Sequence, residues 1–304
     1  MQVSIVMVNY KTYELTKNAI ASIEKETKGI TYEIVVVDNS EDSEETKKLK
    51  TLERENVHVF QNIKNNGFGA GNNFGVKETK GEYVLFLNTD TQLVNNAVFE
   101  LYNVISKDDS IGAVGANLLG KDLKPTTSFE LKEKNLKNEK ESILVDYILK
   151  KKIIKNYYYN YSDKPLVIEG YICGACLMIK RSVFDEIGGF NENIFMYAEE
   201  VLLCRQIREK SHLKLVNVPS AIVIHFEGGS IGWMDSKKAK RFVDGNYLYY
   251  LFSFGNKTSL KYLKRMKRKC HKKQILLSLL GKKEKASYYN YLFKAFLNKI
   301  NEIR

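Results

Sequence analysis

The chain has 304 residues, of which 44% are apolar and only three are proline. This composition excludes a disordered or collagen-like chain and suits one large α/β domain or two closely joined halves. The net charge is +12, but residues 257–304 carry 15 Lys and Arg against two Glu, so this segment holds +13 and residues 1–256 sum to about −1. Such a basic segment suits an anionic membrane surface or a nucleic acid, although a solvated helix face shows the same charges.

Four cysteines are too few for a disulfide framework in a chain of this length, and we expect a reducing, cytoplasmic setting. The first residues lack the basic leader of a signal peptide. No apolar run approaches the roughly 18 residues that a membrane span needs. The sequence therefore predicts a protein without a membrane-spanning helix.

Strand and helix patterns alternate in the first third of the chain. Apolar runs predict strands at residues 3–10, 32–38 and 57–62, and helical periodicity predicts helices at 12–27 and 44–55. A Gly/Asn-rich loop at 65–73 and a short helix precede a buried strand at 82–87. This alternation predicts a mostly parallel sheet whose carboxyl ends carry the ligand-binding loops.

The later elements follow a less regular pattern. A helix is predicted at 98–109 and a strand at 111–119, whereas residues 121–164 lack periodicity and predict a variable, partly helical excursion. A strand and short helix follow over 167–190, a helix over 198–210, and two short strands, broken at Pro219, over 213–226.

The chain after Gly232 is expected to be helical to its end. The last helix places a stripe of apolar residues on one side: Tyr289, Leu292, Phe293, Phe296, Leu297, Ile300 and Ile303. This stripe fits a helix lying in a membrane interface, but it also fits packing on the rest of the chain or a homodimer contact.

Two aspartates stand at predicted strand ends. Asp38 follows the run EIVVV, where a carboxylate can accept hydrogen bonds from a ribose or a base, although Asp is also an ordinary turn residue. Asp90 follows the strand YVLFL and Asn88; it is either a solvated loop acid or a ligand for Mg²⁺ or Mn²⁺. A cation there would neutralise the charge that develops on a diphosphate leaving group.

Three further residues could carry chemistry near the start of a helix and the end of a strand. Glu199 and Glu200 begin the predicted helix at 198–210, where helix capping explains such a pair equally well. His225 ends an apolar strand before a Gly-rich turn, and its imidazole is a candidate second metal ligand.

Two motifs are weaker than they first look. The stretch GFGAGNNFG matches the dinucleotide-binding motif G-x-G-x-x-G imperfectly, and it follows the third predicted strand rather than the first. We therefore interpret it as a loop whose backbone approaches a flat ligand, flanked by the amide side chains of Asn66 and Asn72. Cys173 and Cys176 form C-x-x-C without a second pair or spaced histidines, which favours packing over zinc or redox chemistry.

Taken together, these blocks resemble glycosyltransferase family 2 and, within it, bacterial rhamnosyltransferase-like enzymes of surface polysaccharide synthesis. The resemblance rests on VSIVMVNYKT, VVVDNS, NNGFGAGNNFG, GEYVLFLNTDT, GACLMIKRSVFDEIGGFNENIFMYAEEVLLC and HFEGGS, and covers about residues 3–232. It implies a GT-A fold, with a nucleotide-sugar-binding half at 1–115, an acceptor-binding half at 116–232, and a helical basic extension at 233–304. The resemblance assigns nucleotide-sugar contacts to Asn9, Tyr10, Asp38, Asn66, Gly67, Asn72 and Asn88.

The resemblance also implies a chemistry. Asp90 takes the last position of the D-x-D motif, whose first position is Asn88, and His225 completes a site for Mg²⁺ or Mn²⁺. Glu200, with Glu199 as competitor, matches the general base of an inverting transfer from a UDP- or dTDP-sugar to a glycan or lipid-linked acceptor. Leu202 and Gln206 depart from the acid and the Arg that are common in the family.

This chemistry would place the protein at the inner face of the cell membrane, with the basic tail on anionic lipid. Two alternatives stay open at this point. One is a non-catalytic protein that binds nucleic acid or a membrane surface, and the other is a sugar nucleotidyltransferase, for which the first strand lacks a basic Gly-rich phosphate loop.

Overall fold

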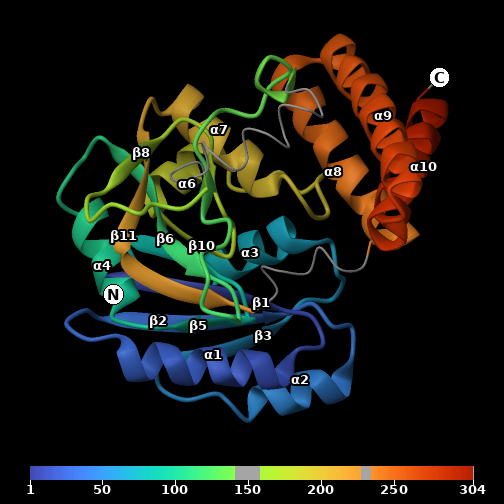
Figure 1. The fold of residues 1–304 in the computed structure, drawn as a ribbon. Coiled ribbons are helices and arrows are strands. Elements are labelled where there is room, and N and C mark those ends of the chain that lie inside the picture. The colour runs from blue at the N-terminus through green and yellow to red at the C-terminus, as the bar shows by residue number, and fades with distance from the viewer. Residues whose placement is uncertain (141–157, 227–233, 304) are drawn as a thin grey trace.

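A computed structural model describes residues 1–140, 158–226 and 234–303 (Figure 1). Within these residues, a nine-stranded sheet has the order β3-β2-β1-β4-β10-β6-β11-β5, and β8 pairs with β11 beside that path. The strands are β1 Val3–Asn9, β2 Tyr32–Asp38, β3 Val57–Gln61, β4 Tyr83–Leu87, β5 Thr91–Leu93, β6 Ile111–Leu119, β8 Leu166–Ile168, β10 Cys176–Lys180 and β11 Lys214–His225. A separate pair joins β7 Phe129–Glu130 to β9 Tyr171–Ile172.

The sheet is parallel in its first half and mixed in its second. Strands β1, β2, β3 and β4 are parallel neighbours, as the alternating pattern predicts. Strand β10 lies antiparallel between β4 and β6, while β6 and β11 are parallel. Parallel pairing is thus confirmed for the first four strands and for β6 with β11, while β10, β5 and β8 add antiparallel neighbours.

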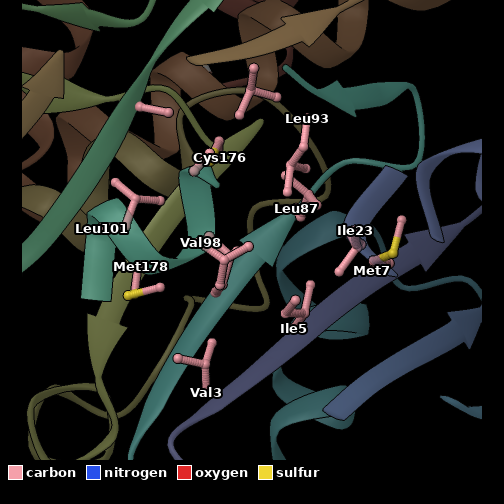
Figure 2. Packing of buried hydrophobic residues seen from close by; sticks show 14 of the residues in the cluster. Val3, Ile5, Met7, Ile23, Leu87, Leu93, Val98, Leu101, Cys176 and Met178 are labelled. Atoms are coloured by element: carbon pink, nitrogen blue, oxygen red, sulfur yellow. The ribbon is translucent and has the colours of Figure 1, made fainter. Parts of the chain in front are cut away.

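Helices cover both faces of the sheet. On β1, Val3, Ile5 and Met7 pack on one face with helices α1 and α4, whereas Val6 packs on the other face with α3, α6 and α7. Figure 2 shows part of the first cluster. The helices are α1 Tyr13–Glu26, α2 Ser43–Lys50, α3 Phe68–Lys77, α4 Ala97–Ile105, α6 Arg181–Ile187, α7 Glu199–Lys210, α8 Ser236–Phe254, α9 Asn256–Leu279 and α10 Lys283–Glu302, with a 3₁₀ turn at Asn138–Lys140.

The Gly/Asn-rich stretch is a helix rather than the predicted loop. Helix α3 starts at Phe68, so Gly69, Gly71 and Gly75 lie inside it. A Cβ added at Gly75 would lie 2.5 Å from Cγ1 of Val6 on β1. Gly71 and Gly75 let the helix lie close to the sheet, and the prediction that this stretch is a loop is wrong, while its approach to a ligand stays a prediction.

Strand β11 is continuous where two short strands were predicted. Its register with β6 shifts between Val218 and Ile222, and Pro219 sits inside this irregularity. A proline has no N–H to donate, and the break in the ladder removes the need for one. The strand therefore continues past Pro219 and carries His225 to the same sheet edge as β5.

The C-terminal extension packs on the α/β body of the chain. A third apolar cluster joins Val201 and Leu202 of α7 to side chains of α8, α9 and α10. Leu292, Phe296 and Ile300 of the predicted stripe are buried in it. Of the three alternatives for this stripe, the structure shows packing within the chain. None of the described helices has both the length and the apolar composition that a membrane crossing needs.

One of the expected domain boundaries lies among the described residues. The boundary between residues 115 and 116 lies inside β6, so both halves share one sheet. The boundary at 232 and the Gly-rich turn after His225 lie outside the described residues. Residues 141–157 of the excursion predicted at 121–164 also lie outside the described residues. The described parts of this excursion hold β7 and the 3₁₀ turn at Asn138–Lys140.

Candidate active site

A cavity of about 420 Å³ opens at the carboxyl ends of β1 and β4. It lies between these strand ends, the segment before β10 and the start of α7, as ligand sites in open α/β sheets do. Six of the residues predicted from sequence line it: Tyr10, Asn88, Asp90, Glu199, Glu200 and His225. Strand ends far apart in the sequence thus meet at one site.

Asp90 and His225 form the polar pair on one side of this cavity. His225 is paired across the sheet with Thr91, and the backbone N–H of Phe226 donates to the carbonyl of Asp90 over 2.9 Å. This pairing brings Nε2 of His225 to 3.3 Å from Oδ1 of Asp90. The amide Nδ2 of Asn88 lies 3.4 Å from the same imidazole nitrogen, and the buried Oδ1 of Asn88 has no hydrogen-bond partner.

These three side chains fit a divalent cation whose remaining ligands come from a substrate. A carboxylate oxygen and an imidazole nitrogen lie 3.3 Å apart here, and the Asn88 amide contacts the same imidazole through Nδ2 while its Oδ1 has no hydrogen-bond partner. Among the described residues, no three His, Cys, Asp or Glu side chains cluster as a complete metal site. Mg²⁺ commonly binds through one or two carboxylates together with substrate phosphates, which is the arrangement that Asp90 allows.

The acidic pair opens helix α7 after an unusual backbone turn. Tyr197 and Ala198 have φ angles of 70° and 76°, in the left-handed region that costs a non-glycine residue about 1–2 kcal/mol. This turn aims the helix start at the cavity, and its dipole favours negative charge there. Strain of this kind is typical of functional sites.

The two glutamates differ in their surroundings. Glu199 is 6% exposed, lies beside Gly69, and its Oε2 is buried without a hydrogen-bond partner. Burial raises its pKa well above the usual value, and the charge of Glu200 adds to this effect. Glu200 is half-buried and lies against Gly174. Burial raises the pKa of Glu200 too, while the nearby Lys134 ammonium lowers it.

Lys134 affects the acidic pair although the sequence did not single it out: its charge lowers the pKa of Glu200, but its side chain does not line the cavity. It belongs to the stretch 121–164, which lacks helix or strand periodicity and carries no motif. Its carbonyl accepts a 2.6 Å hydrogen bond from the hydroxyl of Tyr249 on α8, so the C-terminal extension holds it in place. The only available signal was its positive charge, which many other residues share.

Asp38 and Asn9 form a buried network instead of facing the cavity. Both are 0% exposed. The carboxylate of Asp38 accepts from Nδ2 of Asn9 (3.2 Å), the N–H of Ser40 (3.0 Å) and Oγ1 of Thr46 (2.6 Å). In this structure Asp38 orders the turn after β2, so its contact with a base or ribose stays a prediction.

The remaining predicted nucleotide contacts lie near the start of α3. Nδ2 of Asn72 donates to the carbonyl of Phe68 within the helix, and Asn66 is exposed. Gly67 is buried, with its carbonyl accepting from Nδ2 of Asn39 over 3.3 Å. The structure thus does not bring these three residues into the cavity that Asp90 lines.

The cysteines take no part in metal or disulfide chemistry among the described residues. All four are free thiols. Burial raises the pKa of Cys173 and of Cys176 to about 12, so neither is a thiolate at neutral pH. The packing role predicted for this C-x-x-C motif is confirmed.

The sequence of the chain matches one known family over most of this site. Glycosyl transferase family 2 matches residues 4–188, which contain β1 to β10 and the Asp90 strand end. The chain belongs to glycosyl transferase family 2. The resemblance noted from the sequence is therefore confirmed at the level of the family.

Family 2 relatives match different lengths of the chain. The low-salt glycan biosynthesis hexosyltransferase of Haloferax volcanii is 31% identical over 212 residues, 68% of this chain and 62% of the relative. The N-acetylglucosaminyl-diphospho-decaprenol L-rhamnosyltransferase of Mycobacterium tuberculosis is 41% identical over 71 residues, 23% of this chain and 22% of the relative. The chain thus spans less than two thirds of either relative.

Solved structures with the same fold cover nearly the whole chain. GalNAc-T7, solved with UDP, GalNAc and Mn²⁺, aligns with a TM-score of 0.58 at 19% identity, over 99% of this chain and 57% of that one. The mannosyltransferase PcManGT from Pyrobaculum calidifontis, solved with GDP-Man and Mn²⁺, aligns with a TM-score of 0.58 at 12% identity. This alignment covers 100% of this chain and 88% of that one. The expected GT-A fold is confirmed.

Proposed function

We propose that this family 2 protein transfers a sugar, with inversion, from a nucleoside-diphosphate donor to a hydroxyl of a glycan or lipid-linked acceptor. The observation that carries the proposal is the cavity that gathers Asp90 and His225 on one side and Glu200 on the other. It offers a place for a diphosphate next to a place for an attacking hydroxyl. The relatives' printed names, a hexosyltransferase and a rhamnosyltransferase, support sugar transfer and leave the donor sugar open between rhamnose and other hexoses.

Glu200 acts as the general base in this proposal. Its carboxylate takes the proton of the acceptor hydroxyl while that oxygen forms a bond to the anomeric carbon, and the bond to the nucleoside diphosphate breaks with its electrons leaving on the phosphate. Glu200 is half-buried and lines the cavity, and the charge of Lys134 opposes the rise in its pKa that burial causes. Glu199 is buried, and burial with the charge of Glu200 raises its pKa well above the usual value, so its carboxylate form is disfavoured more strongly.

Asp90, His225 and Asn88 would hold the Mg²⁺ or Mn²⁺ ion. When bound, the ion supplies positive charge against the diphosphate leaving group. Two solved structures with this fold contain Mn²⁺, which supports a divalent ion without choosing between Mg²⁺ and Mn²⁺. Because the chain supplies one carboxylate rather than two, the donor's own phosphates would be needed for tight metal binding.

A thermal-shift panel with UDP, dTDP and GDP, each with Mn²⁺, Mg²⁺ or a chelator, tests donor and metal together. A ligand at 100 times its Kd stabilises the folded state by about 2.7 kcal/mol. One nucleotide should stabilise the protein most, and the chelator should remove most of that gain. If no nucleotide raises the Tm with either metal, the proposal is wrong.

A place at the inner face of the cell membrane completes the proposal, because the mycobacterial relative's printed substrate is lipid-linked.

A further inference from the structure

The turn between α9 and α10 exposes a group of apolar side chains that the described fold leaves uncovered. The last buried residue of α9 is Cys270 and the first of α10 is Ala286, so none of the fifteen residues between them is buried. We call residues 271–285 the hairpin tip. Four of its apolar side chains are exposed by 43% or more: Ile275 46%, Leu276 43%, Leu279 81% and Leu280 59%.

The lengths of the helices explain why the tip is uncovered. Helix α9 has 24 residues and α8 has 19, which correspond to about 36 Å and 28 Å. Gly255 alone joins the two helices, and they pack side by side in the extension (Figure 1). Helix α9 therefore runs past the start of α8 by about 8 Å, and the tip projects beyond the neighbour that would cover it.

The charge around these apolar side chains is strongly positive. The tip contains five Lys against one acid, Glu284. Lys272, Lys282, Lys283 and Lys285 are all exposed. Exposed leucines surrounded by lysines are the chemistry of a segment that inserts apolar side chains into a bilayer while its ammonium groups contact anionic headgroups.

Two other occupants fit the tip less well. A second copy of the chain would bring a tip of the same positive charge against it, and like charges repel. A nucleic acid would gain from aromatic stacking platforms, but the tip has no Tyr, Phe or Trp. An anionic lipid surface is the partner that suits both the leucines and the lysines.

We infer that the hairpin tip, rather than the stripe of α10, is the surface by which this protein binds an anionic membrane. The α10 stripe is not available for this role because its central residues are buried against the extension. Helix α8 starts at the tip's end of the extension, because α9 follows it after Gly255 and packs back along it. The purpose of this docking, access to a lipid-linked acceptor, rests on the proposed function; the binding itself does not.

Co-sedimentation of the full chain with lipid vesicles tests the inference. We expect binding to vesicles of phosphatidylcholine with phosphatidylglycerol, little binding to phosphatidylcholine alone, and weaker binding as salt rises. The double variant Leu279→Gln with Leu280→Gln should weaken binding at least tenfold, because two exposed apolar side chains no longer enter the lipid. Lys282→Glu with Lys283→Glu should weaken vesicle binding by about a hundredfold or more, because reversing two charges lowers the net charge of the tip by four units.

Matched variants on the catalytic body separate the tip from general effects. Leu123→Gln changes a side chain that is 64% exposed, and Lys107→Glu with Lys121→Glu makes the same charge change at exposed sites outside the tip. Both controls should keep most of the vesicle binding. Equal losses in tip and control variants, equal binding to both vesicle types, or no binding to either would overturn the inference.

Two further measurements distinguish lipid binding by the tip from self-association and from a loss of catalysis. Analytical ultracentrifugation of the parent chain and of the leucine variant tests self-association through the tip. If the parent chain self-associates and the leucine variant does not, a second copy covers the tip and the inference is wrong. Transfer to a short water-soluble acceptor should survive in both tip variants. Vesicle binding without any glycosyl transfer would contradict the proposed function and leave the tip assignment intact, so the two failures can be told apart.

Discussion

Nε2 of His225 lies 3.3 Å from Oδ1 of Asp90, although one residue ends β11 and the other follows β4. The antiparallel pairing of β11 with β5 creates this contact, because it fixes His225 opposite Thr91. Both side chains line the cavity together with Asn88. The pair is therefore built into the sheet and does not depend on a flexible loop.

The first prediction concerns this pair. Asp90→Asn keeps the size of the side chain but removes the negative charge, so metal-dependent binding of the nucleoside diphosphate should weaken by about one or two orders of magnitude. His225→Gln should act in the same direction. Isothermal titration with nucleotide, in Mn²⁺ and in chelator, measures the effect.

The matched control for the metal pair is Asp122→Asn, which neutralises an exposed acid in a turn of the body. It should leave nucleotide binding unchanged. A variant of Asp90 that binds nucleotide as tightly as the parent in Mn²⁺ would remove this residue from the metal site.

The second prediction separates the two glutamates. Glu200→Gln cannot take a proton, so turnover should fall by about 10²–10⁴ while nucleotide binding changes little. Glu199→Gln replaces a carboxyl whose pKa burial raises well above the usual value, so it should lose much less. Initial rates with saturating donor and acceptor measure both variants. The opposite ranking would move the base to Glu199.

The third prediction follows from the raised pKa of Glu199. The folded protein keeps this proton at pH values where the unfolded chain has released it, because the ordinary pKa is 4.5. Stability should therefore fall as pH rises above about 4.5, until the folded-state pKa is reached, and stay level above it. Glu199→Gln has no such proton, so its Tm should match the parent near pH 4 and exceed it near neutral pH. A difference in Tm that does not change with pH would contradict this origin.

The fourth prediction uses two glycines with positive φ. Gly67 has φ 102°, and a Cβ there would lie 2.0 Å from the carbonyl oxygen of Phe195, which also accepts from the N–H of Phe68. Gly67→Ala should cost more than about 2 kcal/mol, because strain and a backbone clash combine. Gly188 has φ 85° with open space around it, so Gly188→Ala should cost only about 1–2 kcal/mol. Urea unfolding compares them, and equal costs would mean that the clash relaxes without penalty.

The sequence predicts this site well where strand ends carry it. Asp90 and His225 stand at the ends of apolar runs, and parallel strands bring their carboxyl ends to one edge. It predicts less well where side chains face inward: Asp38 also follows an apolar run, but its hydrogen bonds turn it into the protein. Local pattern alone does not distinguish these two outcomes.

Two other features depend on tertiary contacts that leave no local pattern. The charge of Lys134 acts on Glu200, and Tyr249 of α8 holds the Lys134 backbone; such long-range relations have no periodicity in the sequence. The α10 stripe has the same 3.6-residue pattern whether it faces lipid, a partner or the chain itself. Only the presence of α8 and α9 beside it decides in favour of packing within the chain.

The last prediction tests whether this packing supports the active site. Phe296 is completely buried and its ring lies 6.0 Å from that of Tyr262, in a cluster that reaches Val201 of α7. Phe296→Ala should lower the free energy of unfolding by about 3–5 kcal/mol. Phe252→Ala, at a residue that is 46% exposed on α8, should cost far less. Because α7 carries Glu200 at its start, Phe296→Ala should also reduce turnover on a soluble acceptor, where no membrane takes part. Equal stability of the two variants would show that the extension is only loosely attached, and deletion of residues 257–304 would then be a clean test of membrane binding.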